Sequence, residues 1–454
     1  MFQPCRRVNA ALTASLLVLQ GALSATTSGE FNILAMNVAG LPEILNGNEV
    51  PGDKTTNAGI IGSRFAEYDY DVIHVQEDFN YHAYIYATDD HPYRTATSGG
   101  VPIGSGLNTL SNFDWVSFDR VKWDTCSDAS ENDCLTPKGY TFMRVAIATS
   151  NSTSTYIDMY NLHTDAGTED GDEVARNSNV NQVAARIAAS STGNAVLVFG
   201  DTNSRYTRVA DTAIRALLAS ENAAGPGLTD AWVELERGGV VPTVETVCDN
   251  PSTTNACETV DKVFYRGSAL VELSAAGWTY ASARFLQSNG SVLSDHNPVN
   301  VDFAWAAGGA LRQSAFWGGP HGDWFSDVPT LAGLRAKPKP TLLSFRGASR
   351  LDAVGLTLAD GTVFAHGGTG GDAASLALGA GEVWLGAELC QGEKSGQTRN
   401  FWIRATTNVG RTLEAGTRTD DCTSFAAPSG WQIVGFLGQD GDEMDQLAFV
   451  YAPQ

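Results

Sequence analysis

The sequence predicts a layered α/β sandwich followed by an all-β domain. Up to about residue 304, apolar β-type runs alternate with helical stretches, and each run ends in a polar residue. Beyond that point helix signals vanish, and short strands separated by Gly turns take over. The chain has 454 residues, more than one core normally holds, so we expect two domains.

The first residues have the features of a signal peptide. Arg6 and Arg7 form a basic start, residues 10–19 are mostly apolar, and residues 21–25 are mostly small, as a cleavage site requires. Roughly ten apolar residues cannot span a bilayer, which needs about 20. We therefore expect residues 1–25 to be removed and the protein to be secreted to the extracellular space. An amphipathic start or an uncleaved anchor is the alternative.

The cysteine residues agree with an oxidising compartment. Apart from Cys5, their spacing favours the local pairs Cys126–Cys134, Cys248–Cys257 and Cys390–Cys422. Metal binding by these thiols is the weaker interpretation, because no CxxC spacing occurs. Sequons at Asn151 and Asn289 are compatible with a secreted glycoprotein.

The formal net charge of −22 limits the partners. Such a surface has no general attraction for DNA or anionic membranes. The charge does not exclude a phosphate substrate, because a bound cation can reverse the sign of the charge locally. Nucleic acid therefore remains an alternative partner that the charge does not favour.

In chain order, the N-terminal part predicts strands that end in polar residues, with helices between them. The strands are expected at 31–37, 71–77, 156–163 and 195–201, and the helices at 174–190 and 209–219. Residues 306–310 predict a linker. The later strands are expected at 353–358, 362–364, 382–385, 401–404 and 432–436.

Polar residues with catalytic chemistry follow the N-terminal strands. They are Asn37, Glu77, His163, Asp201, Asn203, Asp261, Asp295 and His296. Hard oxygen ligands suit Mg²⁺ or Ca²⁺, a His beside a carboxylate activates water, and a second His with an amide stabilises phosphoryl charge. Each residue alone could cap a helix, organise a turn or be a core histidine. Their shared place after an apolar strand favours one site.

The same residues lie in motifs that resemble a known superfamily. The ordered motifs are Met36-Asn37-Val38, Val75-Gln76-Glu77, Asn161-Leu162-His163, Gly200-Asp201-Thr202-Asn203, Val260-Asp261-Lys262-Val263-Phe264 and Ser294-Asp295-His296-Asn297-Pro298. Together they resemble the endonuclease/exonuclease/phosphatase superfamily. The resemblance implies a four-layer α/β/β/α sandwich with an active site at one end of two packed sheets.

The resemblance also implies a metal site. Glu77 would be the principal ligand, with Asn37 and Asp295 nearby. The implied cofactor is Mg²⁺ or another divalent cation such as Ca²⁺ or Mn²⁺.

The remaining motif residues receive catalytic roles from the resemblance. His296 would be the general base, oriented by Asp261 or by Asp295. Asp201 and Asn203 would position the nucleophile and the phosphate. His163 would stabilise the transition state or assist the leaving group.

One departure bears on the substrate. Deoxyribonuclease-I-like members carry an additional Glu before the Asn-x-His strand, and residues 93–111 contain no Glu or Asp. The stretch 104–111 is instead similar to sphingomyelinase-like members, as is the stretch 37–42. This tilts the expected substrate toward a phospholipid or sphingolipid at a membrane surface, with a secreted deoxyribonuclease-like nuclease as the alternative. It also weakens an acid role for His163.

The C-terminal part resembles a jacalin-type lectin domain, which implies a β-prism. The matching pieces are 317–322, 351–354, 366–371 and 435–445. The implied sugar site comprises Gly322, Gly441, Asp442 and Asp445, because a carboxylate accepts bonds from sugar hydroxyls while backbone N–H groups donate others. Asp442 and Glu443 would disfavour acidic glycans. The alternative is that these glycines only serve turns.

These expectations combine into one organisation. A signal peptide (1–25) precedes a catalytic domain (26–304), a linker (305–313) and a lectin domain (314–454). The expected protein is a secreted, divalent-metal-dependent phosphodiesterase delivered to glycans by its lectin domain. A glycan-binding protein without catalysis is the remaining alternative.

Overall fold

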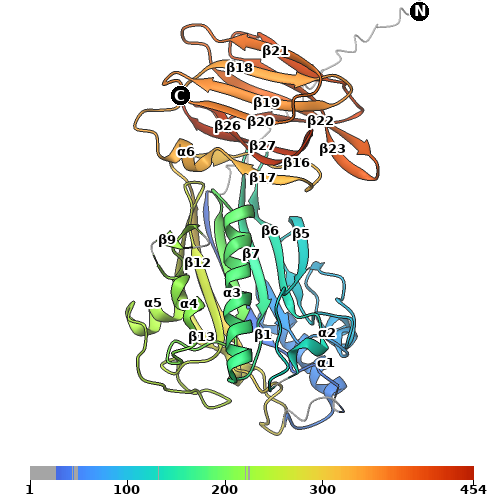
Figure 1. Cartoon of the computed structure of the whole chain (residues 1–454), viewed down its shortest axis with the longest axis vertical. Coiled ribbons are helices and arrows are strands. Elements are labelled where there is room, and N and C mark those ends of the chain that lie inside the picture. The colour runs from blue at the N-terminus through green and yellow to red at the C-terminus, as the bar shows by residue number, and fades with distance from the viewer. Residues whose placement is uncertain (1–26, 43, 45–49, 131, 220, 223–224) are drawn as a thin grey trace, which may run out of the picture.

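The computed structural model describes the chain except for residues 1–26, 43, 45–49, 131, 220 and 223–224. The expected signal peptide therefore lies outside the described residues. Figure 1 shows an α/β domain below and a β domain above it. No helix in the described part of the chain has the length and apolar character needed to cross a membrane.

Two packed sheets form the centre of the lower domain. The strands of the first sheet are β1 (Ser28–Asn37), β2 (Val72–Gln76), β3 (Tyr93–Arg94), β4 (Asn108–Ser111), β13 (Val271–Tyr280) and β14 (Val299–Ala307). Those of the second are β5 (Trp115–Lys122), β6 (Gly139–Thr149), β7 (Ser154–His163), β8 (Ala195–Asp201), β11 (Thr229–Asp230) and β12 (Asp261–Arg266). The first sheet has the order β13–β14–β1–β2–β4–β3, and the second places β8 between β12 and β7.

Helices cover the outer face of each sheet. The helices are α1 (Lys54–Tyr68), α2 (His82–Thr88), α3 (Asp170–Ser190), α4 (Thr212–Ala216) and α5 (Ala231–Arg237). Ile61 and Phe65 of α1 pack with Leu34 of β1, whereas Val183 and Ile187 of α3 pack with the second sheet. The predicted α/β/β/α sandwich is confirmed.

The predicted strands agree with the structure, but the helix bounds differ. α3 begins at Asp170 rather than 174, because Glu169 and Asp172 form a capping box that starts the helix earlier. The helix expected at 209–219 covers only Thr212–Ala216, because Asp211 accepts from Arg205 N (2.8 Å) and keeps the preceding residues in a turn.

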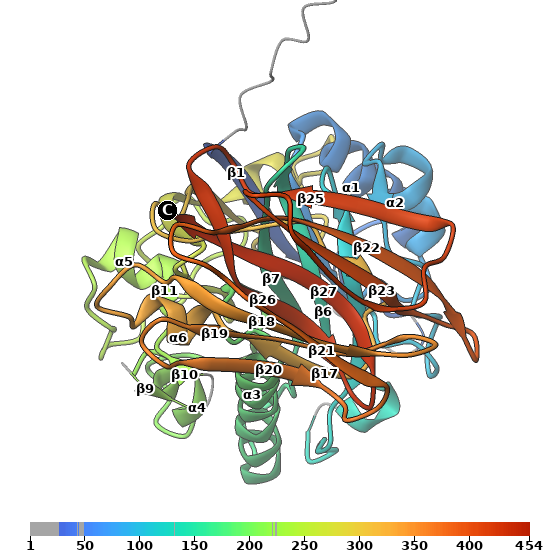
Figure 2. The same cartoon turned by 90° about the horizontal axis from the view of Figure 1, so that it is seen from above.

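The upper domain is a β-prism. Its strands are β16 (Trp317–Gly318), β17 (Asp323–Ser326), β18 (Pro340–Gly347), β19 (Leu351–Leu358), β20 (Val363–Gly367), β21 (Asp372–Ala377), β22 (Trp384–Lys394), β23 (Gln397–Thr407), β24 (Thr412–Gly416), β25 (Asp421–Ala426), β26 (Trp431–Asp440) and β27 (Met444–Pro453). They form the sheets β20–β19–β18–β21 and β24–β23–β22–β25, with β27–β26–β17 as the third side. Figure 2 shows these sheets from above. The short helix α6 (Val328–Ala332), which the sequence analysis did not expect, starts with Pro329 in its first turn.

The predicted linker is partly strand. β14 continues to Ala307, where it still pairs with β13, so the sheet extends beyond residue 304. β15 (Arg312–Gln313) then pairs with both β7 and β27 and joins the sheets of the two domains. The composition of residues 306–310 indicated a free linker, but backbone pairing with strands distant in sequence extends the ordered structure on both sides of Gly308.

An aromatic contact reinforces this junction. Arg144 of β6 is buried and makes a bidentate ion pair with Asp158 at 2.7 and 2.9 Å. Its guanidinium lies 3.7 Å from the ring centroid of Trp324 of β17, and Trp324 Nε1 donates to Thr192 O at 3.0 Å. The two domains therefore share one interface.

All three predicted disulfides are confirmed: Cys126–Cys134, Cys248–Cys257 and Cys390–Cys422. The first two close short loops of the lower domain. The third joins β22 to β25 in the upper domain.

Candidate active site

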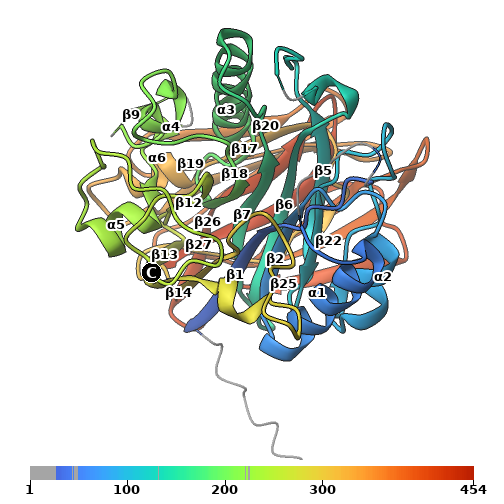
Figure 3. The same cartoon turned by 90° about the horizontal axis from the view of Figure 1, so that it is seen from below.

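The strand directions bring the polar strand ends together. β1 and β2 are parallel, as are β7 and β8, so the carboxyl ends of each pair lie at one end of the sandwich. His163 pairs in register with Asp201, and Asp201 pairs with Asp261 at the start of β12. Ser154, at the other end of β7 from His163, pairs with β15. The end of the sandwich that carries His163 therefore points away from the upper domain. Figure 3 looks toward this end.

A cavity of about 780 Å³ opens at these strand ends. Its lining includes predicted site residues and residues that sequence analysis did not select. They are Leu41, Ile44, Glu77, Phe79, Asp128, Asn132, Asp133, Cys134, Leu135, Thr136, Lys138, His163, Ala166, Asp201, Asn203, Asp295 and His296. A second hollow of about 190 Å³ continues past His296 toward Arg205 and Val247, and Asp261 lies there.

His296 is held between two carboxylates. Its Nδ1 lies 3.0 Å from Asp261 Oδ2, and its Nε2 lies 3.7 Å from Asp201 Oδ2. Burial lowers the pKa of His296, but Asp261 and Asp201 outweigh burial and raise that pKa well above its usual value. Of the two carboxylates proposed to orient His296, the structure places Asp261 at its ring.

Asn37 connects Glu77 to Asp201. Its Nδ2 donates to Glu77 Oε1 at 3.1 Å and to Asp201 Oδ2 at 3.2 Å. Its Oδ1 accepts from Ala39 N at 3.0 Å, which fixes the orientation of the amide. Asn37 therefore links the two carboxylates, and its oxygen keeps a second lone pair, so its place among the metal ligands stays a prediction.

The donor set suits a divalent cation. Glu77, Asp201 and Asp295 line the cavity, whereas Lys138 and His296 supply the cationic charge there, so carboxylates are in excess. Burial raises the pKa of Glu77, although the charges of Lys138 and His296 act in the opposite direction. Ligand atoms of Asp201, Asp261 and His296 also lie within 4.8 Å of one another. Carboxylate oxygens are what Mg²⁺ and Ca²⁺ prefer.

Two strand-end residues have left-handed backbone. Glu77 has φ 57° and Asn203 has φ 46°, a region that non-glycine residues seldom adopt. Asp201 Oδ1 accepts from Asn203 N at 2.9 Å, and Asn203 Nδ2 donates to Thr164 O at 3.1 Å. These bonds hold both side chains of the Gly-Asp-x-Asn motif in place.

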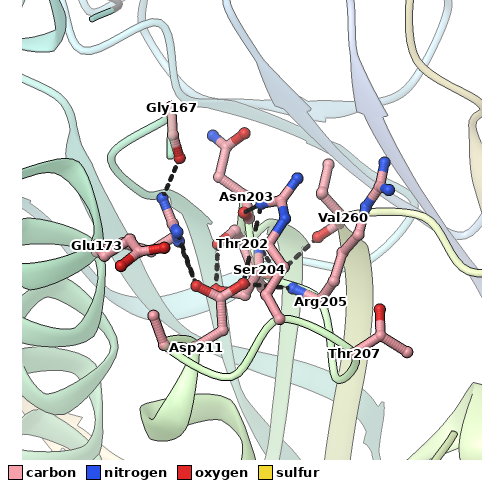
Figure 4. A network of polar contacts seen from close by, with 12 residues as sticks. Gly167, Glu173, Thr202, Asn203, Ser204, Arg205, Thr207, Asp211 and Val260 are labelled. Atoms are coloured by element: carbon pink, nitrogen blue, oxygen red, sulfur yellow. Dashed lines mark hydrogen bonds and ion pairs between the residues drawn. The ribbon is translucent and has the colours of Figure 1, made fainter. Parts of the chain in front are cut away.

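A buried polar network supports the Asn203 turn (Figure 4). Arg176 of α3 donates to Asp211 Oδ1 at 2.7 and 2.9 Å and to Gly167 O at 2.8 Å. Arg208 Nη1 donates to Asn203 O at 2.9 Å, and Arg205 pairs with Glu245 at 2.7 Å. From the sequence, Arg205 and Arg208 could either contact substrate phosphate or be solvated at the surface. In the structure both guanidinium groups have protein partners.

Sequence analysis missed Lys138. Its Nζ lies 3.1 Å from His163 Nε2 and forms an ion pair with Asp133, in the segment that the Cys126–Cys134 disulfide precedes. Burial, followed by the charge of Lys138, lowers the pKa of His163 to about 3, so His163 is neutral. The available signal was one lysine in the otherwise acidic stretch 124–138.

Asp295 and Asn108 are two further polar residues of the lower domain that bear on the site. Asp295 is exposed at the cavity, where it follows Ser294, whose hydroxyl donates to Asn37 O at 2.6 Å. Asn108 occupies the stretch that lacks Glu and donates to Asp78 Oδ2 at 2.7 Å. His163 Nδ1 has no hydrogen-bond partner among the described residues. No carboxylate of that stretch therefore pairs with His163.

The predicted sugar loops also come together. A side chain at Gly322 would come within 2.6 Å of Asp445 Oδ2, which shows how closely the two loops approach. Asp445 forms an ion pair with Arg399, and Glu443 pairs with Arg350 and Lys394. Glu443 is thus neutralised by two cations, whereas Asp442, on which the expected bias against acidic glycans also rests, has no ion pair among the described residues. Gly441 and Asp442 lie exposed in the same loop.

Comparisons with known proteins agree with both resemblances. Residues 54–302 match the model of endonuclease/exonuclease/phosphatase family 2, and residues 314–450 match the jacalin-like lectin domain. Curated relatives called sphingomyelinase, from Mycobacterium bovis and Mycobacterium tuberculosis, are 37% identical over 289 residues, which is 62% of this chain and 54% of theirs. The chain thus spans about half the length of these relatives.

Similar solved structures cover each domain separately. Wild-type Malaysian banana lectin matches 32% of this chain and 100% of its own, with 22% identity and a TM-score of 0.28. Truncated Caenorhabditis elegans TDP2 matches 60% of this chain and 97% of its own, with 16% identity and a TM-score of 0.40. A Staphylococcus aureus beta toxin structure matches 60% and 99%, with 14% identity and a TM-score of 0.41.

Proposed function

The chain belongs to the endonuclease/exonuclease/phosphatase family, and from this premise we propose that it is a divalent-metal-dependent phosphodiesterase. The observation that carries the proposal is the arrangement of His296, Asp261 and Asp201 beside Glu77 at one cavity. A base held by a carboxylate, next to an excess of oxygen ligands, is what hydrolysis of a phosphodiester requires.

In this mechanism His296 activates the attacking water. The Asp261 carboxylate accepts a hydrogen bond from Nδ1–H, which keeps that proton on the ring and leaves Nε2 free to take a proton from water at the Asp201 side. Asp201 and Asn203, held by their mutual hydrogen bond, orient the water and the phosphate. The water oxygen forms the new bond to phosphorus, and the bond to the leaving oxygen breaks.

Lys138, which lines the same cavity as His296, stabilises negative charge in this mechanism. The ammonium lies 3.1 Å from Nε2 of neutral His163, which accepts a hydrogen bond from it, so His163 holds Lys138 while the remaining N–H groups of the ammonium can donate to the phosphoryl or leaving oxygen. Glu77, with Asp201 or Asp295, would hold Mg²⁺ or another divalent cation. When bound, the cation neutralises phosphate charge and acts as a Lewis acid.

The substrate that we favour is a phospholipid or sphingolipid. The supporting observations are the sphingomyelinase relatives and Asn108 in the stretch where deoxyribonuclease-like members carry Glu. The net charge of −22 gives no general attraction to DNA. Purified protein should be assayed with Mg²⁺ on sphingomyelin vesicles, on DNA and on a chromogenic phosphodiester, beside His296→Ala. We expect lipid hydrolysis by the wild type alone; hydrolysis of DNA only would refute the lipid preference, and equal activity of the variant would refute the mechanism.

We further propose that the upper domain binds glycans and that the protein is secreted. The jacalin-like match and the approach of Gly322 to Asp445 support glycan binding, and the three disulfides support an oxidising compartment. A glycan array with the full chain and Asp445→Ala tests the first claim, since unchanged binding would exclude this site. N-terminal sequencing of protein from culture medium tests the second, with a start near Ala25 or Thr26 expected.

A further inference from the structure

Aliphatic side chains are exposed around the mouth of the active-site cavity. Ile44 and Leu135 line the cavity itself, and Val247 lines the neighbouring hollow beside His296. Ile103 is exposed on the loop 99–106, whose Gly106 lies against Phe79 and Glu77. Separate loops thus place exposed aliphatic side chains at or beside this cavity.

The loops near Leu135, Val247 and Ile103 are held in place by their own contacts. The Cys126–Cys134 and Cys248–Cys257 disulfides close the loops that directly adjoin Leu135 and Val247 in the chain. Gly104 N donates to Gly100 O at 2.9 Å and closes the loop that carries Ile103. Rigid loops lose little conformational entropy when a surface covers their side chains, so their burial retains most of its favourable free energy.

The charges on the same loops indicate which kind of surface can cover these side chains. Segments 41–53, 99–106 and 238–257 contain no Lys or Arg, and segment 126–138 contains only Lys138, which is paired with Asp133. The neighbouring Arg205 is paired with Glu245. An anionic surface would therefore meet carboxylates rather than cations, whereas a zwitterionic surface presents no net charge to repel them.

We propose that the aliphatic collar, comprising Ile44, Ile103, Leu135, Val244 and Val247, docks on a bilayer of zwitterionic lipid with the cavity facing the headgroups. Val244 belongs to the collar because it adjoins Glu245, whose carboxylate pairs with Arg205 at the second hollow. The inference rests on the proposed lipid phosphodiesterase function. It adds the surface by which this chain reaches such a substrate, through burial of apolar side chains and without a basic patch.

Ile103 and Val244 allow a test outside the catalytic cavity. Their exposed fractions are 80% and 76%, and those of Val363 and Val409 on the upper domain are 65% and 63%, which makes the latter pair a matched control. The variants are Ile103→Ser with Val244→Ser, and Val363→Ser with Val409→Ser. Co-sedimentation with phosphatidylcholine vesicles in EDTA measures binding without hydrolysis.

We expect the collar variant to bind these vesicles about tenfold or more weakly, since burial of two aliphatic side chains is lost, and the control to bind like the wild type. Binding should be insensitive to salt and should weaken when phosphatidylglycerol replaces part of the phosphatidylcholine. Equal binding of collar variant and wild type, equal loss in both variants, or binding to anionic vesicles alone would each overturn the proposal.

A soluble chromogenic phosphodiester separates this proposal from the proposed function. We expect the collar variant to hydrolyse it at the wild-type rate, because neither residue lines the cavity. Loss of this activity in the variant would show damage to the site and would overturn the assignment of a docking role. If the wild type binds vesicles but cleaves neither substrate with Mg²⁺, the phosphodiesterase function fails while the docking surface stands.

Discussion

Lys138 Nζ lies 3.1 Å from His163 Nε2, because the antiparallel pairing that sets Tyr140 of β6 opposite Leu162 of β7 brings the start of β6 beside the end of β7. Lys138 follows the loop that the Cys126–Cys134 disulfide closes and directly precedes β6, whereas His163 ends β7. The contact places a positive charge beside a histidine that is itself neutral. Several expectations for activity depend on this and neighbouring contacts.

Replacing Lys138 by Ala should lower kcat about 100-fold, because the site loses its preorganised cation for phosphoryl charge. Initial rates on a chromogenic phosphodiester measure the effect. Lys122→Ala is the control, since Lys122 is an exposed lysine of β5. If Lys138→Ala retained wild-type kcat, the role assigned to the ammonium group would be wrong.

Asp261→Asn should shift the pH dependence of catalysis. His296 must be neutral to act as a base, so kcat/KM falls as pH falls through its pKa, which Asp261 and Asp201 raise against the effect of burial. Removing the Asp261 charge lowers that pKa and moves the acidic limb to lower pH, while the plateau falls about 100-fold because the ring is no longer oriented. A pH–rate profile that kept its acidic limb unchanged would exclude the pairing as the cause.

Activity should require a divalent cation, and Glu77 should be the residue that contributes most to its binding. EDTA is expected to abolish activity and Mg²⁺ to restore it, with Glu77→Gln needing far more Mg²⁺ for half-maximal rate. Burial raises the pKa of Glu77, so protons compete with the cation and the half-saturating Mg²⁺ concentration should increase as pH is lowered. Full activity in EDTA would contradict the assignment.

The Cys126–Cys134 disulfide should matter for activity as well as stability. It closes the loop that carries Asp133 and precedes Lys138, so replacing both cysteines by Ser should lower kcat. The same change at Cys390 and Cys422 is the control, because that disulfide lies within the prism. Equal kcat values for both double variants would show that the loop needs no covalent closure.

Arg144→Ala should destabilise the protein by about 3–5 kcal/mol, because it leaves the buried Asp158 carboxylate without its partner. Arg186→Ala is the control, since Arg186 pairs with Asp119 at the surface, where an ion pair contributes about 0–1 kcal/mol. Chemical denaturation measures both free energies of unfolding. Similar losses in the two variants would refute the importance of burial.

Sequence patterns predicted the parts of the molecule that depend on local order. The strand at 195–201 has the predicted bounds, because a continuous apolar run that ends in Gly-Asp leaves little choice. Two disulfides followed from short spacings, and the third from the isolation of Cys390 and Cys422 in the C-terminal region. His296 and Asp261 were selected from motifs, and the structure places their side chains 3.0 Å apart.

Other features depend on residues far apart in the chain. Lys138 has no motif of its own, and its meaning comes from the position of His163. The contact between Arg144 and Trp324 joins two domains, and neither sequence neighbourhood indicates it. The amide of Asn37 was expected among the metal ligands, yet its orientation follows from the hydrogen bond with Ala39 N.

The short strand β15 makes the two domains continuous through backbone hydrogen bonds to β7 and β27. A glycan held by the prism and a bond cleaved at the cavity must then lie at one separation, which the length of β7 and the prism together impose. The two sites would be held at a fixed distance instead of being joined by a flexible linker. Only surfaces whose sugars stand at that height above the reactive layer could engage both ends of the molecule at once.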